Sequence, residues 1–151
     1  MIDYFFGNYL MKFHNINIEY NYNTNNTTAL VLIATKPSFW LPLVIKNALN
    51  KIKNCNFYFF GSQETIYLLK NTLKININYT EINDFRNITS YNKILLDQQF
   101  WSKFEEEYIL ILQPDCIILR DLTLSDFEYD FIGAVCGHFN NNNYIINGGL
   151  S

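Results

Sequence analysis

Two short apolar runs in the second half of the chain constrain the fold most. They are Tyr108–Leu112 and Cys116–Leu119, and Gln113-Pro114-Asp115 separates them. Both runs are rich in Ile and Leu and are too short for a typical helix, which is typical of strands buried in a sheet. Proline cannot donate to a sheet ladder, so Pro114 marks the end of the first strand. The pattern therefore predicts two buried strands, with Asp115 at the carboxyl end of a central one.

Three earlier strands are predicted upstream of this stretch. Ala29–Ala34 is a continuous apolar run, Asn56–Phe60 is strongly aromatic, and Ile75–Ile82 alternates like a less buried strand. Two helices between them show apolar stripes, which consist of Leu41, Ile45, Ala48 and Ile52 in one helix and Ile66, Leu69 and Leu73 in the other.

Capping residues predict where these helices begin. Ser38 is expected to cap the first helix and Ser62 the second, with Glu64 favourably placed in the first turn. A third helix is expected over 90–104, with Ile94, Trp101 and Phe104 at helical spacing. Residues 120–128 are expected to be irregular or a short helical turn, and 129–135 a further short strand.

The resulting β-α-β-α-β-α-β-turn-β order predicts an α/β fold, with a mostly parallel central sheet flanked by helices. A length of 151 residues suits one domain. We expect that domain over 29–151. Residues 1–28 are predicted to be an N-terminal extension or edge element, either a strand or a short helix.

Composition excludes several classes of protein. The net charge is −3 and the basic residues are scattered, which argues against nucleic acid as a partner. Three cysteines without CxxC spacing predict neither a disulfide framework nor a zinc site. Neither a signal peptide nor a run of ~20 apolar residues, as a membrane span needs, is evident. We therefore expect a soluble, cytoplasmic protein without a transmembrane segment. The abundance of asparagine is interpreted mostly as a compositional bias.

Missing motifs narrow the choice among α/β folds. The turn after the first strand, 35–38, contains no glycine, so the G-x-G-x-x-G dinucleotide motif is absent. A P-loop and a G-x-S-x-G elbow are also absent. Phospho-acceptor receiver domains have acidic residues at the end of the first strand, and this chain has none there. Elimination leaves a sheet whose most evident carboxylate, Asp115, follows the fourth strand.

Six short motifs in order carry a resemblance to a known family. They are Ala34-Thr35-Lys36-Pro37, Phe59-Phe60-Gly61, the segment from Tyr91-Asn92-Lys93 to Phe100-Trp101, Leu110 to Asp115, Phe127 to Ala134, and Asn147-Gly148-Gly149-Leu150-Ser151. Residues 29–151 resemble the nucleotide-sugar-binding part of GT-A-type glycosyltransferases, which have a Rossmann-like fold. They are most similar to a glycosyltransferase-like group catalogued mainly as a domain of unknown function.

The resemblance implies a metal site at Asp115. In GT-A enzymes an Asp-x-Asp motif ends the equivalent strand, and its last carboxylate holds a divalent metal, Mn or Mg, that bridges the donor diphosphate. Gln113 replaces the first Asp here, and a glutamine is a poor metal ligand but can hydrogen-bond a ribose or a phosphate. Alternatively, Asp115 only stabilises a turn after proline.

Other residues are expected to bind the nucleotide. By the resemblance, Thr35 and Lys36 lie at the nucleotide, unless Lys36 is an exposed loop lysine. Tyr91, Asn92 and Lys93 are expected to open a helix whose N-terminus favours anions, unless Tyr91 belongs to the core and Asn92 is only near a cap. Asn147, Gly148 and Gly149 resemble the loop beside the donor sugar, or they form an ordinary turn. Asp130 is expected to order its loop, and His138 is expected to be exposed.

The leading hypothesis is a domain that binds a nucleotide-diphosphate sugar with a divalent metal and transfers the sugar to an acceptor hydroxyl. The acceptor and the catalytic residues are not identified by the sequence. The resemblance stops inside a motif at Ser151, so the domain is expected to be truncated at its C-terminus. An inactive fragment or degenerate binding module is therefore a second hypothesis. A third is a non-enzymatic structural or interaction protein.

Overall fold

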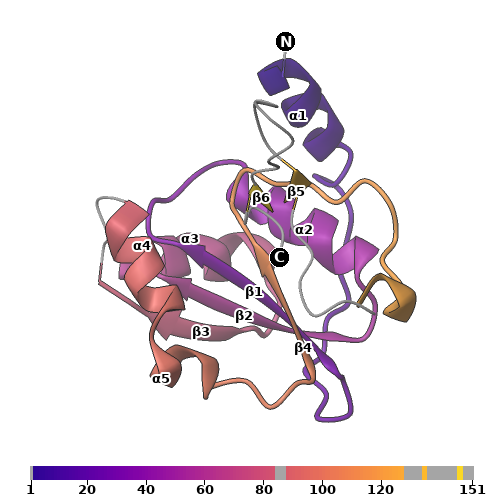
Figure 1. The fold of residues 1–151 in the computed structure, drawn as a ribbon. Coiled ribbons are helices and arrows are strands. Elements are labelled where there is room, and N and C mark those ends of the chain that lie inside the picture. The colour runs from indigo at the N-terminus through magenta and orange to yellow at the C-terminus, as the bar shows by residue number, and fades with distance from the viewer. Residues whose placement is uncertain (1, 84–87, 128–133, 136–145, 148–151) are drawn as a thin grey trace, which may run out of the picture.

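A computed structural model describes residues 2–83, 88–127, 134–135 and 146–147 (Figure 1). Its helices and strands alternate over the first half of the chain, as the apolar patterns predict. They are, in chain order, α1 (Ile2–Met11), β1 (Thr28–Ala34), α2 (Leu41–Lys51), β2 (Cys55–Gly61), α3 (Gln63–Leu73), β3 (Asn78–Glu81), α4 (Ile88–Leu95), α5 (Gln98–Trp101), β4 (Tyr108–Leu112), a 3-10 turn over Leu124–Phe127, β5 (Ala134–Val135) and β6 (Ile146–Asn147).

The main sheet has four strands, all parallel, in the order β3-β2-β1-β4. The α/β fold with a parallel sheet is therefore confirmed. Because β1 is flanked by β2 and β4, it is central, and β4 pairs with β1 alone among the described residues. The prediction that β4 is a central strand is wrong for this part of the chain. The strands β5 and β6 form a separate antiparallel pair.

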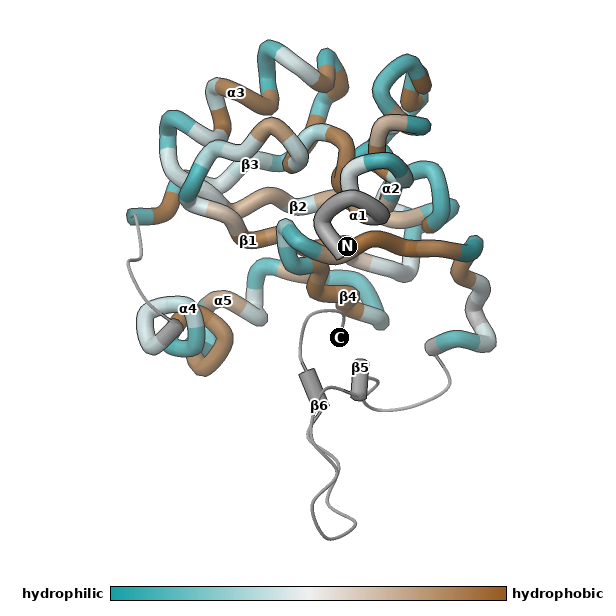
Figure 2. Tube along the Cα trace, turned by 90° about the horizontal axis from the view of Figure 1, so that it is seen from above, coloured by the Kyte–Doolittle hydropathy of each residue, from teal (hydrophilic) through white to brown (hydrophobic). Residues whose placement is uncertain are grey.

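Alternate residues of β1 pack into two cores, one on each face of the sheet. Leu30, Leu32 and Ala34 belong to the core beneath α2 and α3. Ala29, Val31 and Ile33 belong to the other core, together with Phe100 of α5 and side chains of α4. Figure 2 shows this layering, with α2 and α3 on one side of the strands and α4 and α5 on the other. Burial on both faces explains why β1 is an unbroken apolar run.

The N-terminal helix α1 packs against the main core. Leu10 is fully buried in that core, and the Phe6 ring meets the Trp40 ring edge-on at 6.3 Å. Gly7 lies directly beneath the Trp40 indole, because a Cβ there would be 3.0 Å from its Cη2. Of the two alternatives for residues 1–28, the structure has a helix, followed by turns and irregular chain that lead into β1.

The second predicted strand of the central stretch, Cys116–Leu119, is not part of a sheet. These residues run without ladder pairing over α2, and Ile118 is buried against Asn47. The Asn47 Nδ2 donates to the Ile118 carbonyl at 2.9 Å, and the Ile118 N–H donates to Asn47 Oδ1 at 2.8 Å. A side-chain amide thus satisfies the backbone groups that a neighbouring strand would otherwise satisfy.

Two helix predictions are corrected. Ser38 does not cap the first helix, because α2 begins at Leu41 and Trp40 at the cap position makes no side-chain capping bond. The helix expected over 90–104 is two helices, because α4 ends at Leu95 and Asp97 then caps α5 by accepting a bond from the Gln99 N–H. The predicted cap at Ser62 is confirmed, since its hydroxyl accepts a bond from the Thr65 N–H.

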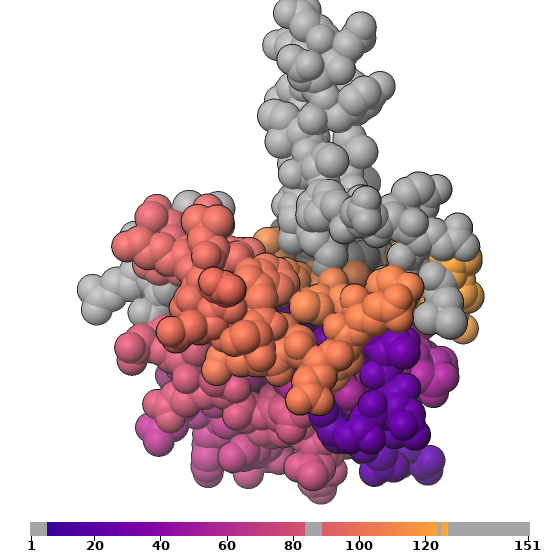
Figure 3. Space-filling view, turned by 60° about the horizontal axis from the view of Figure 1, so that its bottom comes forward, coloured from indigo at the N-terminus to yellow at the C-terminus, as the bar shows by residue number. Residues whose placement is uncertain are grey.

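Asparagine side chains organise the amino edge of the sheet. The buried Asn56 Oδ1 accepts bonds from the Asn23 N–H and Asn26 Nδ2, and its Nδ2 donates to Glu106. The loop before β1 is thereby tied to β2 and to the residues that precede β4. Figure 3 shows the stretch around β4 beside N-terminal residues on the face turned forward. Part of the asparagine bias therefore has a structural role.

In the part of the chain that the structure describes, no helix is both long and apolar enough to cross a bilayer.

Candidate functional site

The strand order creates a switch point between β1 and β4. The chain builds β1, β2 and β3 outward in one direction and then crosses back, so that β4 lies on the other side of β1. Open α/β sheets bind ligands in the crevice beyond the carboxyl ends of the strands at such a point. Leu32 of β1 pairs with Leu112 of β4. Thr35 and Asp115 each lie three residues after this pair, in loops at the same carboxyl edge of the sheet. The candidate site is therefore formed by the loops after β1 and β4.

The loop after β1 is fixed by two hydroxyl groups, from Ser62 at the cap of α3 and from Thr65 within it. The Thr35 carbonyl accepts bonds from Ser62 Oγ at 2.6 Å and from Thr65 Oγ1 at 2.9 Å. Thr35 itself is buried, whereas the following residue, Lys36, is exposed. Thr35 thus anchors the loop, and the exposed Lys36 follows it at the carboxyl edge of the sheet. Sequence reasoning missed Ser62 and Thr65 as supports, because a helix cap does not reveal that it also binds a neighbouring loop.

The loop after β4 is a β-turn over Gln113–Cys116. The Cys116 N–H donates to the Gln113 carbonyl at 3.1 Å, and Pro114 occupies the second turn position, where its fixed φ is favourable. Asp115 follows at the third position with an exposed side chain, while Gln113 is half-buried. The structure therefore has Asp115 in a turn, as the alternative interpretation held, and that turn displays the carboxylate to solvent.

Tyr91 of α4 joins Gln113 and Asp115 at this edge. Burial raises the pKa of the Tyr91 hydroxyl, a side-chain hydrogen bond with Gln113 lowers it, and the nearby Asp115 charge raises it further. The net pKa is raised, and Tyr91 stays neutral at physiological pH.

The prediction that Tyr91, Asn92 and Lys93 open a helix is wrong. Helix α4 begins at Ile88, which puts all three residues beyond its first three positions. Their N–H groups are therefore not the free donors of a helix N-terminus. Tyr91 packs in the core beside Ile94, whereas Asn92 and Lys93 are exposed. Of the three, the structure ties only Tyr91 to Gln113 and Asp115.

Cys116 lies beside this group, but its thiol is poorly suited to nucleophilic chemistry. Burial raises the pKa of the Cys116 thiol, and the Asp115 charge raises it further. Because its pKa is raised, the Cys116 thiol stays protonated at neutral pH. The thiolate is the form that reacts as a nucleophile, so this cysteine is a weak one.

The oxygen donors at the site fit a cation that is shared with a diphosphate. No group of three or more His, Cys, Asp or Glu side chains placed to hold a metal occurs among the residues that the structure describes. A closed protein cage is therefore not formed by these ranges. Mg²⁺ is commonly held by one or two carboxylates together with substrate phosphates and water. The exposed Asp115 carboxylate, with Gln113 two residues before it, suits this second mode of binding.

Several predicted residues fall at or beyond the described ranges. The backbone of Asn147 is in β6, paired with Ala134. Gly148, Gly149, Asp130 and His138 lie outside the described residues.

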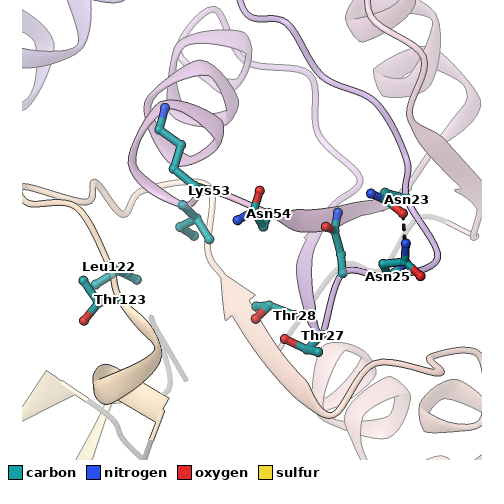
Figure 4. Close-up of a pocket in the computed structure, with 10 residues that line it drawn as sticks. Asn23, Asn25, Thr27, Thr28, Lys53, Asn54, Leu122 and Thr123 are labelled. Carbon is teal, nitrogen blue, oxygen red and sulfur yellow. Dashed lines mark hydrogen bonds between the residues drawn. The ribbon is translucent and has the colours of Figure 1, made fainter.

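A cavity of about 460 Å³ occurs at the opposite, amino edge of the sheet (Figure 4). Its lining combines amides and hydroxyls of the loop before β1, of Asn54 and of Thr123 with the side chains of Ile52, Lys53 and Leu122. One internal bond there joins the Asn25 N–H to Asn23 Oδ1 at 2.9 Å. Because the carboxyl edge is where parallel sheets bind ligands, we place the candidate site at the switch point and not in this cavity.

Fold and site together define a doubly wound α/β protein with a carboxylate, an amide and a lysine at its switch point. The chain belongs to the family described as Protein of unknown function (DUF5672), whose profile matches residues 74–151, or 78 of the 151 residues. The match includes α4, α5, β4 and the Gln113–Cys116 turn, whereas Thr35 and Lys36 precede it. The family description states no activity. No curated protein and no solved structure matches the chain.

Proposed function

We propose that this protein binds a nucleotide-diphosphate sugar at the switch point and transfers the sugar to an acceptor hydroxyl. The observation that carries the proposal is the register of β1 with β4, which brings the loop that carries Lys36 and the turn that carries Gln113 and Asp115 to the same carboxyl edge of the sheet. The resemblance to GT-A-type enzymes supplies the reaction class, because a fold alone does not specify an activity.

Each group has a distinct role in this proposal. Lys36 attracts a phosphate as a point charge on a loop that Ser62 and Thr65 hold in place. Asp115 holds Mn²⁺ or Mg²⁺, and Gln113 hydrogen-bonds the nucleotide. When bound, the metal neutralises the charge that develops on the leaving nucleoside diphosphate. Asn147, Gly148 and Gly149 are proposed to border the donor sugar.

A binding module without turnover is the second candidate. The observation in its favour is that a single carboxylate, Asp115, occurs in the two loops of the switch point, 35–40 and 113–119. Such a module would bind the donor through the same residues and would release no free sugar or glycoside.

The compartment is also part of the proposal. The two described cysteines, Cys55 and Cys116, are free thiols. Free thiols fit a reducing environment, so we propose a cytoplasmic location.

Calorimetric titration with UDP-, GDP- and CMP-sugars in the presence of Mn²⁺ tests this function. We expect one of them to bind, and we expect Asp115→Asn to abolish binding because an amide is a much weaker cation ligand. Asp97→Asn is the matched control, because Asp97 is also exposed but caps α5 away from the switch point. Product formation would separate the enzyme from the binding module. If no nucleotide binds, the structural or interaction protein is favoured instead.

A further inference from the structure

The cavity at the amino edge of the sheet is formed by three segments that are far apart in the sequence. They are the loop 23–28, the turn 52–54 between α2 and β2, and residues 122–123. Figure 4 shows Asn23 and Asn25 on one side of the cavity and Leu122 and Thr123 on the opposite side. Its volume of about 460 Å³ is within the range of roughly 300–1,000 Å³ that is typical of small-molecule sites.

Hydrogen bonds hold the walls of this cavity in place. The side-chain oxygen of Asn56, which is 1% exposed, accepts bonds from the Asn23 N–H at 3.0 Å and from Asn26 Nδ2 at 3.1 Å. Across the cavity, the Leu122 N–H donates to the Lys51 carbonyl at the end of α2 at 3.0 Å. Because these segments are already fixed, a ligand would not have to order them on binding.

Two side-chain amides at the cavity are available to a ligand. Among the residues that the structure describes, the side chains of Asn25 and Asn54 make no hydrogen bond to another protein group. Asn54 has a φ of 56°, in the left-handed region that asparagine tolerates better than most residues. Figure 4 shows it between the two walls. Each amide offers two N–H donors and one carbonyl acceptor.

The lining also indicates the chemical class of the ligand. None of its ten residues is acidic, so the lining has no carboxylate for a divalent cation. Its one cationic side chain, Lys53, extends away from the other labelled side chains in Figure 4, which does not suit a phosphate. Ile52 and Leu122 add apolar surface beside the amides and hydroxyls. A sugar ring has the matching surface, because each hydroxyl both donates and accepts and the C–H groups of the ring are apolar.

We propose that this cavity is a binding site for a neutral saccharide. The amides of Asn25 and Asn54 bond its hydroxyls, and Ile52 and Leu122 contact the C–H groups of its ring. This inference does not rest on the proposed function. The cavity lies at the opposite edge of the sheet from the switch point, so a saccharide bound here is neither donor nor acceptor of a transfer there.

Titration of the full, ¹⁵N-labelled chain with methyl glycosides of glucose, galactose, mannose and N-acetylglucosamine tests the proposal by NMR. We expect at least one glycoside to shift the side-chain NH₂ signals of Asn25 and Asn54. We expect the backbone signals of Lys36 and Asp115 at the switch point to stay unchanged.

Asn54→Gly removes one amide and keeps the backbone, because glycine adopts a positive φ readily. We expect the affinity for the glycoside to fall about 3- to 10-fold, the range expected when one hydrogen bond is lost. Lys74→Gly is the matched control, since Lys74 has a φ of 54° at the end of α3 and does not line the cavity. It should bind as the wild type does.

Asn25→Ala should weaken binding to a similar extent as Asn54→Gly. Its control is Asn71→Ala, because Asn71 is also an exposed asparagine but lies on α3 and bonds the Tyr67 carbonyl within its own helix. Thermal unfolding of all four variants checks that the fold is intact.

Lys53→Met and inorganic phosphate test the charge of the ligand. A site for a neutral saccharide should bind the glycoside equally well with Lys53→Met and should not respond to phosphate. If phosphate shifts the Asn25 and Asn54 signals and Lys53→Met removes that response, the cavity is an anion site and the inference is overturned.

The remaining outcomes also decide the matter. The inference fails if no glycoside shifts the two amide signals, or if Asn54→Gly and Asn25→Ala bind as tightly as their controls. It also fails if the glycosides shift Lys36 and Asp115 instead, and that result would favour the proposed function. Because the two sites lie at opposite edges, the loss of one proposal leaves the other standing.

Discussion

Asn47 and Ile118, 71 positions apart in the sequence, exchange two hydrogen bonds between a side-chain amide and a backbone peptide. Asn47 is fully buried in α2, and Ile118 lies three residues after Asp115. The bonds hold the segment that follows the Gln113–Cys116 turn against the helix. The turn that displays Asp115 is therefore held between β4 on one side and this buried contact on the other.

Replacing Asn47 by leucine should strongly destabilise the protein. The substitution keeps an approximate side-chain size but leaves the Ile118 N–H buried without a partner, at about 1–3 kcal/mol. The Ile118 carbonyl loses its bond from Asn47 and keeps the one from the Tyr9 hydroxyl at 3.3 Å. We expect the free energy of unfolding to fall by roughly 2–4 kcal/mol in urea titrations. Asn71→Leu is the control, because Asn71 is exposed on α3 and bonds only its own helix. A loss no larger than that of the control would contradict the role of this contact.

Asn47→Asp should make stability depend on pH. An ionised carboxylate can still accept from the Ile118 N–H but repels the Ile118 carbonyl, so burial and this repulsion raise the pKa of the introduced carboxyl group in the folded state. Below the unfolded pKa of about 3.9 both states are protonated, and the variant is closest to the wild type. As the pH rises through the folded pKa, the variant loses stability. Urea midpoints of both proteins between about pH 3 and 8 measure this, and a constant difference would refute it.

Alkaline pH should unfold the protein through its buried thiol and phenols. Burial raises the pKa of Cys55 to about 12, and it likewise raises the pKa of Tyr20 to about 12. In the unfolded chain these groups ionise near about 8.5 and about 10. Both raised pKa values mean that stability is fully present below the unfolded pKa and falls as the pH rises toward about 12. Cys55→Ala should have a shallower pH slope between about pH 8.5 and 10, and an unchanged slope would argue against this cause.

Gly61→Ala should be costly because this glycine has no room for a side chain. A Cβ would lie 2.4 Å from Cε1 of Phe59 and 2.6 Å from the carbonyl oxygen of Ala34. Forcing the strands apart should cost about 1–3 kcal/mol of unfolding free energy, measured in urea. Gly7→Ala is the contrasting variant, since its Cβ would meet the Trp40 indole at 3.0 Å and alanine favours the helix. Gly7→Ala should therefore cost less, and the reverse order would contradict the packing at β2.

Ser62→Ala should weaken both stability and phosphate binding. The hydroxyl caps α3 and donates to the Thr35 carbonyl, which holds the loop that carries Lys36. Loss of the cap should cost about 1 kcal/mol by urea titration. Affinity for Mn²⁺–pyrophosphate should fall as well. Asp97→Ala removes the cap of α5 but touches neither loop of the site, so it should lower stability alone. Equal affinities for the two variants would exclude a role of Ser62 at the site.

The regular part of the fold is predictable because its signals are local. The runs of β1 and β4 are bounded by polar residues, and the apolar stripes of α2 and α3 repeat at helical spacing. Tyr108–Leu112 is confirmed residue for residue as β4. The Cys116–Leu119 run has the same composition, and yet its partner is a helical asparagine. Of this run only Ile118 is buried, and Leu119 is 60% exposed. An apolar run therefore reveals neither full burial nor whether a strand or a helix covers it.

The site is predictable only where sequence neighbours define it. A turn at the end of a strand is predicted by the sequence Gln113-Pro114-Asp115, and the structure has that turn. The link from Tyr91 to Gln113 depends on how α4 packs against the sheet, and the link from Thr35 to Ser62 depends on the pairing of β1 with β2. The Asp97 cap was a readable signal for the break between α4 and α5, since Asp is a common N-cap residue.

The parallel pairing of β1 with β4 also has a kinetic consequence. On one side of β1, Thr28 pairs with Tyr108 of β4, which lies 80 residues later in the sequence. On the other side, Thr28 pairs with Cys55 of β2, which lies only 27 residues later. Contacts between residues so distant in sequence form slowly. We therefore expect β1 to β3 to assemble first and the candidate site to appear only when β4 docks. A partly folded chain that lacks this last step would keep much of its core and would have no place for a ligand.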